Sequence, residues 1–431
     1  MRIVKLNEEA RKNIQENILK RSPVRYTEQE SAVKEIIDRV KYEGDTAVFE
    51  YTKRFDGAVI NAGNILVTEE EIASAYKAVD PKLLDVIRKA LVNIRSFHEK
   101  QLQNSWFTTT EQGTILGQKI TPLERVGVYV PGGKAVYPSS VLMNVVPAKT
   151  AGVREICMAT PCSRDGAVNP SVLVAAKEAG ADKIFKAGGA QAIAAFAFGT
   201  ESIPKVDKIV GPGNIFVALA KKAVYGNVSI DSVAGPSEIL VLADETADPR
   251  YVAADLLSQA EHDELASAVL ITTSRDLAEK VSDEVDGFLS KLDRKEIMEK
   301  SLDNFGYILL ADDMQEAIDA ANAVASEHLE IMTKDPFQIM TKIRNAGAIF
   351  IGEYSSEPLG DYFAGPNHIL PTNGTARFFS PLSVDDFVKK SSIIHYSREA
   401  LESIHRDIEQ FAKCEGLTAH ANSIAVRFED K

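Results

Sequence analysis

The chain contains few cysteines and no long apolar segment. Its 431 residues include only Cys157, Cys162 and Cys414, and no two of them form a C-x-x-C pair. An odd number of cysteines without that spacing excludes a disulfide framework and a thiolate zinc knot, and it is typical of a reducing compartment. No apolar run is long enough to span a bilayer, and the N-terminus lacks the apolar core and the cleavage site of a signal peptide. We therefore expect a cytoplasmic protein.

An excess of positive charge is also absent. The formal net charge is −13, whereas a nucleic-acid binder needs a basic face that displaces counterions from phosphates. The same charge disfavours adsorption to anionic membranes. Hydrophobic residues make up 45% of the chain and charged residues 26%, as in an ordinary globular protein. The length suggests roughly two to three domains. We expect neither a nucleic-acid partner nor a membrane partner.

The spacing of apolar residues predicts helices first and α/β structure afterwards. Helices are expected within 30–49 and from Asp80-Pro81 onward, where aspartate caps and proline occupies the first turn. Threonine-rich segments around a glycine predict a hairpin over 108–123. From about residue 384 the pattern returns to helix, and it ends in a short apolar alternation over 423–428.

The middle of the chain repeats the order strand, glycine turn, helix. This order is typical of parallel sheets with crossover helices, so we expect two α/β domains. The expected strands form two series, 126–130, 155–159, 183–186 and 208–210, then 239–242, 268–271, 307–310 and 348–351.

No G-x-G-x-x-G fingerprint follows any of these strands. Two other glycine turns, Gly188-Gly189-Ala190-Gln191 and Gly211-Pro212-Gly213-Asn214, lie between a strand and a helix start. Backbone amides at such a turn can bind a diphosphate, but the same turns also occur in α/β proteins without a nucleotide. A dinucleotide site is therefore one of two open interpretations.

Polar residues around four of the seven histidines, His262, His328, His368 and His420, are the candidates for chemistry. Gln259 and His262 end an expected helix, and a spacing of three places both on one face, about 5–6 Å apart at Cβ. They suit one metal ion or one substrate, or else a solvent-exposed histidine that the helix dipole favours. Glu327 and His328 are expected late in a helix that starts near Asp313. They are the usual groups for general acid–base chemistry, or else a solvated helix end.

Further candidates lie later in the chain. Asp361 is expected in a loop after the strand 348–351, and loops at the carboxyl ends of parallel strands bind ligands. An aspartate in such a loop is also a common turn former, and His420 is equally ambiguous. With Gln259 and His262 they make a plausible nitrogen and oxygen set for zinc, although the spacing matches no short zinc motif. Cys157 lies in an apolar strand, so no thiol is a good candidate nucleophile.

Eight blocks of sequence between about residues 120 and 425 resemble the histidinol dehydrogenase family, and they occur in that family's order. They are RVGVYVPGG from 125, GGAQAIA from 188, GPGN from 211, AGPSE from 234, SQAEH from 258, SEHLE from 326, NHILPT from 367 and EGLTAHA from 415. The one unfamiliar residue, Asn373 where glycine is more usual, lies outside the expected functional positions.

The resemblance implies an activity and a role for each candidate. The activity is oxidation of L-histidinol through L-histidinal to L-histidine with reduction of two NAD, the last steps of histidine biosynthesis. One zinc ion per subunit would be bound by Gln259, His262, Asp361 and His420, with His420 reaching the other subunit of a homodimer that shares its active sites. Glu327 and His328 match the acid–base pair. Substrate contacts match Ser237, His368 and Glu415 in addition to His328 and the zinc ligands, and NAD contacts match Tyr129, Gln191 and Asn214.

The family's fold consists of two incomplete Rossmann-like domains with parallel sheets, N-terminal helices and a helical C-terminal tail. On this chain it implies a first α/β domain from 24–127 and 239–381, a second, NAD-contacting domain from 128–238, and an arm and tail from 1–23 and 382–431 that contact the partner subunit. A zinc hydrolase in which Glu327 activates water is the alternative from a different class.

Overall fold

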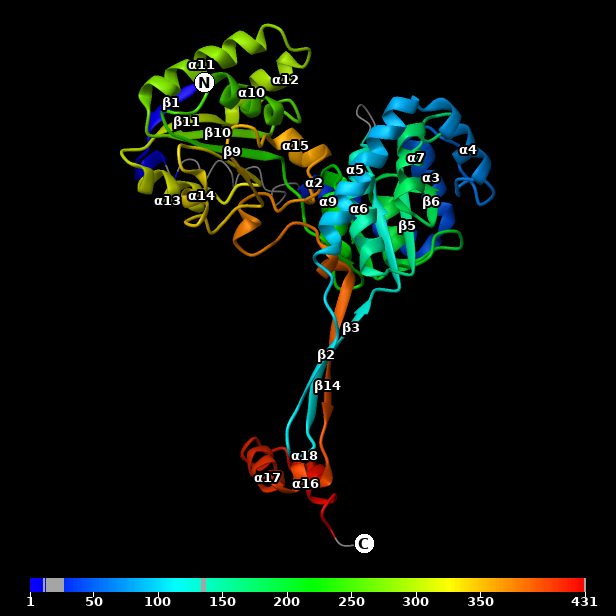
Figure 1. Cartoon of the computed structure of the whole chain (residues 1–431). Helices are drawn as coiled ribbons and strands as arrows, with labels where there is room; N and C mark the ends of the chain where they lie inside the picture. Colours follow the sequence, from blue (N-terminus) through cyan, green and yellow to red (C-terminus); the bar gives the residue numbers. More distant parts are fainter. Residues whose placement is uncertain (11, 13–26, 133–136, 430–431) are drawn as a thin grey trace. The chain divides into compact units, whose positions relative to one another are not determined.

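A computed structural model describes residues 1–10, 12, 27–132 and 137–429. The chain divides into two compact units. Unit 1 comprises residues 1–101 and 123–387, and unit 2 comprises 102–122 and 388–431. Unit 1 contains two parallel sheets and unit 2 one antiparallel sheet (Figure 1). The predicted α/β class, with parallel sheets and a helical C-terminal stretch, is confirmed.

The larger sheet of unit 1 has six parallel strands in the order β1-β11-β10-β9-β12-β13. The strands are β1 (Arg2–Lys5), β9 (Glu238–Ala243), β10 (Ser267–Thr272), β11 (Gly306–Leu310), β12 (His328–Met332) and β13 (Ala348–Ile351). Helices α10 (Pro249–Ala260), α11 (Arg275–Leu289) and α12 (Lys295–Phe305) cover one face, and α13 (Met314–Val324) and α14 (Pro336–Met340) cover the other. Because both faces are covered, the central strands β9 and β10 are mostly apolar, as the sequence pattern predicts.

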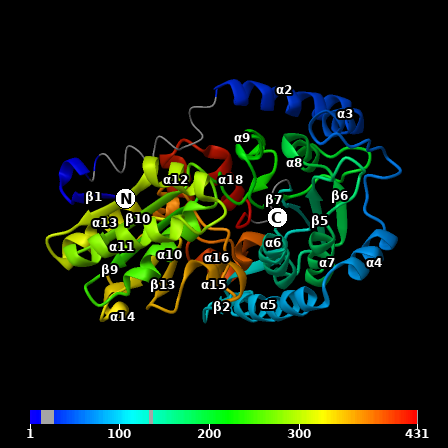
Figure 2. The same ribbon diagram turned by 90° about the horizontal axis from the view of Figure 1, so that it is seen from above.

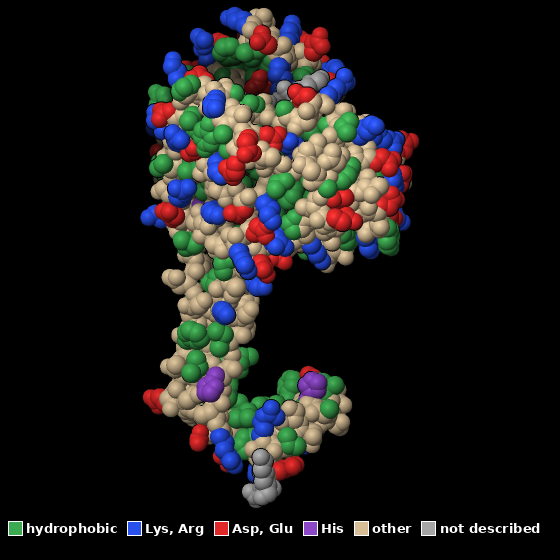
Figure 3. Space-filling model, turned by 90° about the vertical axis from the view of Figure 1, so that its right-hand side faces the viewer, with side chains coloured by type: hydrophobic (Ala, Val, Ile, Leu, Met, Phe, Trp, Pro, Cys, Tyr) green, Lys and Arg blue, Asp and Glu red, His purple; other side chains and the backbone are tan. Residues whose placement is uncertain are grey.

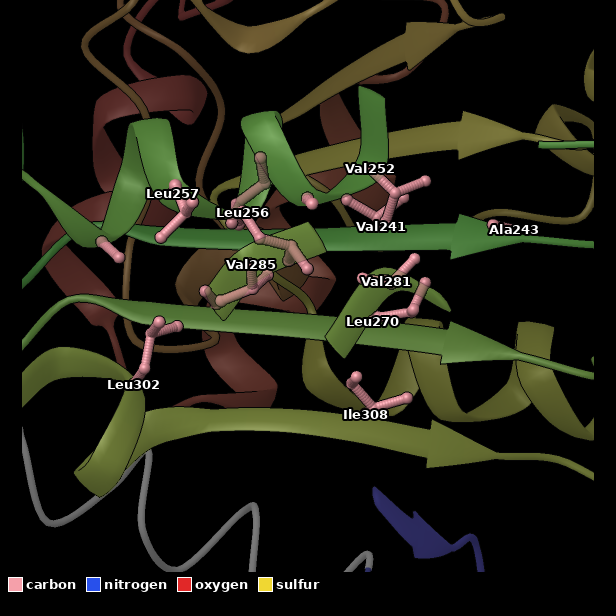
Figure 4. Close-up of a cluster of buried hydrophobic side chains, with 14 of the residues drawn as sticks. Val241, Ala243, Val252, Leu256, Leu257, Leu270, Val281, Val285, Leu302 and Ile308 are labelled. Atoms are coloured by element: carbon pink, nitrogen blue, oxygen red, sulfur yellow. The ribbon is translucent and has the colours of Figure 1, made fainter. Parts of the chain in front are cut away.

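Buried apolar side chains between the six-stranded sheet and helices α10 and α11 hold the helices against the sheet. Val241, Leu270 and Ile308 project from three adjacent strands toward Leu256 and Val281 of the covering helices, and all five are fully buried (Figure 4). Burying a side chain of this size contributes about 1.5–3 kcal/mol. The apolar stripe of α11 recurs at helical spacing, which fixes the face that this helix turns to the sheet.

The smaller sheet of unit 1 has five parallel strands in the order β6-β5-β4-β7-β8. The strands are β4 (Arg125–Tyr129), β5 (Glu155–Thr160), β6 (Lys183–Lys186), β7 (Lys208–Val210) and β8 (Ser229–Ile230). The helices between them are α6 (Pro138–Ala151), α7 (Pro170–Ala179), α8 (Gly189–Phe198) and α9 (Ile215–Val224). Figure 2 shows α6 and α7 on one side of this sheet and α8 and α9 on the other.

The N-terminal helices pack on this smaller sheet. They are α2 (Thr27–Glu43), α3 (Asp45–Phe55), α4 (Glu69–Ala78) and α5 (Pro81–Glu99), and they contact α6, α7, α8 and α9. The amide of Val67 donates to the carbonyl of Ile184, and the amide of Lys186 donates to the carbonyl of Ile65, so this connection is tied to β6. These contacts tie helices α2 to α5 to the five-stranded sheet, and residues 102–122 belong to unit 2. Helix α8 is apolar on all sides and needs a cover on its outer face, which α2 and α3 supply. The precise domain boundaries stay a prediction.

Unit 2 contains an antiparallel sheet in the order β14-β3-β2 and three helices. The hairpin predicted over 108–123 is confirmed as β2 (Trp106–Thr109) and β3 (Ile115–Pro122). The helix expected from about residue 384 begins as a short 3-10 helix, η3 (Val384–Phe387), but the sequence did not predict the next element, β14 (Val388–His395), which pairs with all eight residues of β3. The α-helices follow β14, as α16 (Arg398–Glu402), α17 (His405–Cys414) and α18 (Thr418–Ala425). The expected apolar alternation over 423–428 instead includes the end of α18.

Charge is mixed over the surface. Figure 3 shows lysine and arginine side chains interspersed with aspartate and glutamate on the face that it presents. In the part of the chain that the structure describes, no helix is both long and apolar enough to cross a membrane.

Candidate active site

A cavity of about 670 Å³ in unit 1 brings most of the predicted site residues together. We call it the site cavity. Among the predicted residues, those that line it are Asn214, Ser237, Gln259, His262, Glu327, His328, Asp361 and His368. Its walls combine turns that follow strands of the five-stranded sheet with segments that precede strands of the six-stranded sheet. The site therefore uses the carboxyl edge of one sheet and the amino edge of the other.

The amino edge is a departure from expectation. Ser237 immediately precedes β9, and His328 is the first residue of β12. In open parallel sheets ligands usually bind at the carboxyl ends of the strands, and the sequence expectation for Asp361 relied on that rule. The six-stranded sheet departs from the rule, whereas Gly211-Pro212-Gly213-Asn214, which follows β7, obeys it.

Glu327 and His328 do not lie late in a helix, so that expectation was wrong. Helix α13 ends at Val324, where Ala325 adopts a left-handed conformation with φ of 53°. The chain then extends, and the carbonyl of Glu327 accepts a hydrogen bond from the amide of Ala348 at the start of β13. Both side chains are thus fixed at the beginning of β12, which has a hydrogen-bonded strand on each side.

The main chain of one residue, Glu238, contacts both Glu327 and His328, which are proposed as an acid–base pair and are called the acid–base pair below. The amide of Glu238 donates to Oε2 of Glu327 at 2.9 Å, and the carbonyl oxygen of Glu238 lies 3.0 Å from Nδ1 of His328. A carbonyl only accepts, so this contact places the imidazole proton on Nδ1. The other ring nitrogen, Nε2, is buried with no hydrogen-bond partner and lies 3.9 Å from Oδ1 of Asp361. Its lone pair is free to take a proton inside the cavity.

Burial moves the pKa values of the pair in opposite directions. It lowers the pKa of His328 to about 4, because the charged imidazolium loses its hydration. It raises the pKa of Glu327 well above its usual value, and the negative charges of Glu238, Asp361 and Glu357 add to the increase. His328 is therefore neutral near pH 7, the form that accepts a proton, and Glu327 is a stronger base than an exposed glutamate.

Three further side chains converge on one point beside this pair. His262, Glu357 and Asp361 each offer one ligand atom, and these atoms all lie within 4.8 Å of one another. We call these three residues the ligand cluster. Nε2 of His262 lies 4.0 Å from Oε1 of Glu357. Gln259 is 1% exposed, and its Oε1 has no hydrogen-bond partner. A buried amide oxygen without a donor, next to an imidazole and two carboxylates, fits a cation such as zinc.

The local structure of these ligands differs from expectation. Gln259 lies in the last turn of α10, but His262 follows the end of that helix, and its amide donates to the carbonyl of Gln259. Asp361 lies on a short helix, α15 (Glu357–Tyr362), rather than in a loop. Glu357 was missed by the sequence reasoning. Its spacing of four from Asp361, on a segment opened by Ser356 and Pro358, is the signal that indicates a shared helix face.

Burial also raises the pKa values of both carboxyls in the cluster. The pKa of Glu357 rises to about 7 and that of Asp361 to about 6, with burial as the largest cause in each case. For Glu357 the charge of Asp361 is the next cause. Two buried acids this close repel each other when both are ionised, so a cation between them would relieve an existing electrostatic cost.

His368 closes another side of the site cavity. Its Nδ1 lies 3.0 Å from the carbonyl oxygen of Asp361, and its Nε2 lies 3.3 Å from Oγ of Ser140. Burial lowers the pKa of His368 to about 4, so this imidazole is neutral at pH 7. The backbone contact ties the loop that carries His368 to α15, and it keeps the ring beside the ligand cluster.

The residues predicted to contact NAD lie at two glycine turns of the five-stranded sheet. Asn214 lines the site cavity, and its Oδ1 caps α9 by accepting the amides of Phe216 and Val217. Tyr129 and Gln191 do not line the site cavity. Both are buried beside Gly189, whose amide donates to the hydroxyl of Tyr129 at 3.1 Å. Oε1 of Gln191 is buried without a partner.

Glu415 and His420 belong to unit 2. Glu415 follows α17 and His420 lies on α18, and both are exposed there. Every residue that lines the site cavity belongs to unit 1. The structure thus assigns these two residues to a different unit from the rest of the predicted site, and their roles stay a prediction.

Comparison with known proteins decides the family. The model of the family "Histidinol dehydrogenase" matches residues 19–428. Histidinol dehydrogenase of Clostridium acetobutylicum is 59% identical over 397 residues, covering 92% of this chain and 92% of that protein. The Bacillus subtilis protein of the same name is also 59% identical, over 400 residues and 93% of each chain. This chain belongs to the histidinol dehydrogenase family.

A solved structure agrees with this assignment. The crystal structure of histidinol dehydrogenase from Elizabethkingia anophelis superposes with a TM-score of 0.93 at 38% identity, covering 99% of this chain and 98% of that one. The resemblance inferred from the eight sequence blocks is confirmed. A family named for a dehydrogenase supports an oxidoreductase and gives no support to the alternative of a zinc hydrolase.

Proposed function

We propose that this histidinol dehydrogenase family member oxidises L-histidinol through L-histidinal to L-histidine, with reduction of two NAD, in the cytoplasm. The observation that carries the proposal is the acid–base pair, which is anchored on Glu238 and opens into the same cavity as the ligand cluster. An alcohol becomes an acid by loss of two hydrides and addition of one water. That sequence requires groups that accept protons at two stages.

We propose one zinc ion per subunit, bound by Gln259, His262 and Asp361 and by His420 of the partner subunit. When bound, zinc supplies a redox-inert positive charge that anchors the imidazole and amine of the substrate and fixes the reacting carbon. The partnerless Oε1 of Gln259 and the convergence of His262 with Asp361 support the first three ligands. Glu357 is a further carboxylate within reach of the same point.

His328 takes the first proton in this proposal. Its Nε2 accepts the hydroxyl proton of histidinol while the carbon-bound hydrogen leaves as hydride to NAD, which produces histidinal and one NADH. The hydrogen bond from Nδ1 to the carbonyl of Glu238 keeps the basic nitrogen directed into the cavity and stabilises the imidazolium that forms. Ser237 and His368, which also line the cavity, would contact the substrate, and we propose the same role for Glu415.

Glu327 activates the water for the second oxidation. One carboxylate oxygen, Oε2, is held by the amide of Glu238, and Oε1 remains to take a proton from water as it adds to the aldehyde. The imidazolium of His328 gives its proton to the aldehyde oxygen as the water adds, which completes the hydrate. Neutral His328 then takes one hydroxyl proton of the hydrate as the second hydride leaves to another NAD, and the carboxylic acid that forms loses its proton to the solvent. The products are the carboxylate and a second NADH. The thiol of Cys157 is not needed, because burial raises its pKa to about 12 and keeps it protonated.

The NAD site is proposed at the glycine turns, with Tyr129, Gln191 and Asn214 as contacts. Two features support it. The carboxyl ends of the parallel strands β4, β6 and β7 meet at one sheet edge, and helix N-termini at such an edge favour a diphosphate.

The decisive test of function is an NADH absorbance assay with purified, zinc-loaded protein, histidinol and NAD. We expect two NADH per histidinol consumed, no signal after dialysis against a chelator, and recovery on adding zinc. Zinc-loaded protein that forms no NADH would overturn the proposal. The shared site has its own test. Mixing inactive His262→Ala and His420→Ala proteins should restore activity, because one hybrid site would contain both intact residues.

A further inference from the structure

The short helix α15, which carries both carboxylates of the ligand cluster, begins without a side-chain cap. Ser356 precedes the helix, and its hydroxyl makes no capping hydrogen bond. The second residue, Pro358, has no amide hydrogen. The amide of Glu357 is therefore the donor in the first turn that needs an acceptor, and Glu357 is only 2% exposed, so bulk water does not provide one.

A glutamate from the six-stranded sheet provides this acceptor. Oε1 of Glu330, on β12, accepts the amide hydrogen of Glu357 at 2.8 Å, and Glu330 is 1% exposed. Glu330 is two residues after His328, so the two side chains leave the same face of the strand. Its backbone pairs with β9 on one side and β13 on the other, so the strand that carries Glu330 is held from both sides.

A second contact restrains the side chain of Glu357. Oγ of Ser258, on α10, lies 3.0 Å from Oε2 of Glu357. With Oε2 engaged by this hydroxyl, Oε1 is the oxygen directed at Nε2 of His262, 4.0 Å away. The same Oγ also lies 2.8 Å from the carbonyl oxygen of Asp255, so its one hydrogen is shared between two acceptors. Glu330 therefore fixes the backbone at the start of α15, and Ser258 is a weaker restraint on the carboxylate of Glu357.

A buried carboxyl is a costly choice for this position. The neighbouring residues of β12, Leu329 and Ile331, are buried and apolar, and an apolar side chain at 330 would avoid the cost of burying an acid. A carboxyl of Asp255, itself largely buried, adds electrostatic repulsion nearby. Asp255 also interacts with Glu330 through a side-chain hydrogen bond, and the contact with α15 is the one that links Glu330 to the ligand cluster.

We propose that Glu330 is a positioning residue that holds the first turn of α15, so that Glu357 and Asp361 present their carboxylates to His262 in the geometry that a metal ion requires. The inference rests on the proposed zinc site. It concerns the preorganisation of the ligands, because neither oxygen of Glu330 is assigned to the metal or to the substrate.

The test is zinc affinity of the full-length protein, measured by competition with a chromophoric chelator. Glu330→Met removes the acceptor and approximately keeps the volume, and we expect zinc to bind roughly 10- to 100-fold more weakly, the usual loss when a group supporting a metal ligand is removed. Glu330→Gln keeps a carbonyl oxygen for the amide of Glu357, and its affinity should stay within about threefold of wild type. Ser258→Ala should show an intermediate loss.

A matched control separates positioning from general loss of stability. Ser301 is fully buried on α12, and its hydroxyl donates to the carbonyl of Ala266 at 2.9 Å. Ser301→Ala therefore also removes a buried hydrogen bond beside the same sheet, and it should lower the melting temperature without changing zinc affinity. The visible spectrum of the cobalt-substituted protein is a second readout, and it should change in Glu330→Met but not in Ser301→Ala.

The outcomes are distinguishable. Wild-type protein that binds no zinc would overturn the zinc site itself. Wild type and Glu330→Met that bind zinc equally tightly would overturn the positioning role alone, and so would equal losses in Glu330→Gln and Glu330→Met. If Glu330→Met does not fold, the other two variants decide. Tight binding by Glu330→Gln with weaker binding by Ser258→Ala supports the proposal, and the reverse order contradicts it.

Discussion

Replacing Glu327 by glutamine should stop the reaction at the aldehyde. Glutamine has the shape of glutamate, and its carbonyl oxygen can still accept the amide of Glu238, the contact that measures 2.9 Å in the structure. Such a hydrogen bond contributes about 0.5–1.5 kcal/mol to stability, so a variant that keeps it should unfold at nearly the wild-type temperature. The amide cannot take a proton from water. The change therefore removes the proposed base for hydration and leaves His328 and its anchor unchanged.

The expected magnitude follows from the value of a general base. A positioned base contributes roughly 100- to 10,000-fold to a rate, which is roughly 3 to 5 kcal/mol of transition-state stabilisation. Oxidation of added histidinal should fall by a factor in this range in Glu327→Gln. Oxidation of histidinol to histidinal should fall far less, because that step needs only the proton acceptor His328.

Rapid-mixing absorbance measurements distinguish the two steps. With histidinol, Glu327→Gln should give a first phase of about one NADH per site, followed by a slow phase, whereas wild type continues to two NADH per substrate. Glu279→Gln is the matched control, since it makes the same chemical change at an exposed position on α11. Equal losses of both oxidation steps in Glu327→Gln would refute the assignment of water activation to this residue.

Three other predictions concern single side chains. His328→Asn should lower both oxidation steps by comparable factors of roughly 100 to 10,000 in steady-state NADH assays, and loss of only one step would contradict the reuse of Nε2. Cys157→Ala should retain both steps, because burial raises the pKa of this thiol to about 12; loss of histidinal oxidation in a folded variant would point instead to a thiolate adduct. Gly211→Ala should lower the melting temperature by several degrees or abolish soluble expression. The reason is that φ is +113° at this residue and that an added Cβ would clash with the carbonyl oxygen of Tyr129. An unchanged melting temperature would show that this turn has a different conformation in solution.

Local sequence predicts much of the fold where one physical signal dominates. Strands β5, β9 and β10 are runs of buried apolar residues because helices cover both faces of their sheets, and such runs are visible without any structure. Helix α11 shows its buried stripe at helical spacing. Strand β14 has no such apolar run, because most of its side chains are exposed. Its pairing with β3 joins segments far apart in the chain, which local sequence does not reveal.

The wrong predictions of local structure at the site also arose where contacts distant in sequence decide the backbone conformation. The end of α13 at Ala325 has no local signal, since alanine is a strong helix former and its left-handed conformation is imposed by the surrounding fold. That turn moves Glu327 and His328 from a helix end to the start of a strand. Glu357 was missed because its spacing of four from Asp361 indicates only a shared helix face and not that α15 folds back toward His262.

The sequence by itself determined the α/β class, the family and the chemical types available for catalysis, because apolar periodicity and short residue blocks are local properties. Only the tertiary structure decided that the amide and the carbonyl of Glu238 contact the two side chains of the acid–base pair. It also decided that the amino edge of one sheet and the carboxyl edge of the other line a single cavity. The tertiary structure further decided that Glu357 lies beside Asp361 in the ligand cluster and that Glu330 contacts the start of the helix that carries both. These are contacts between segments separated by tens to hundreds of residues, and burial and proton affinity depend on such contacts rather than on neighbours along the chain.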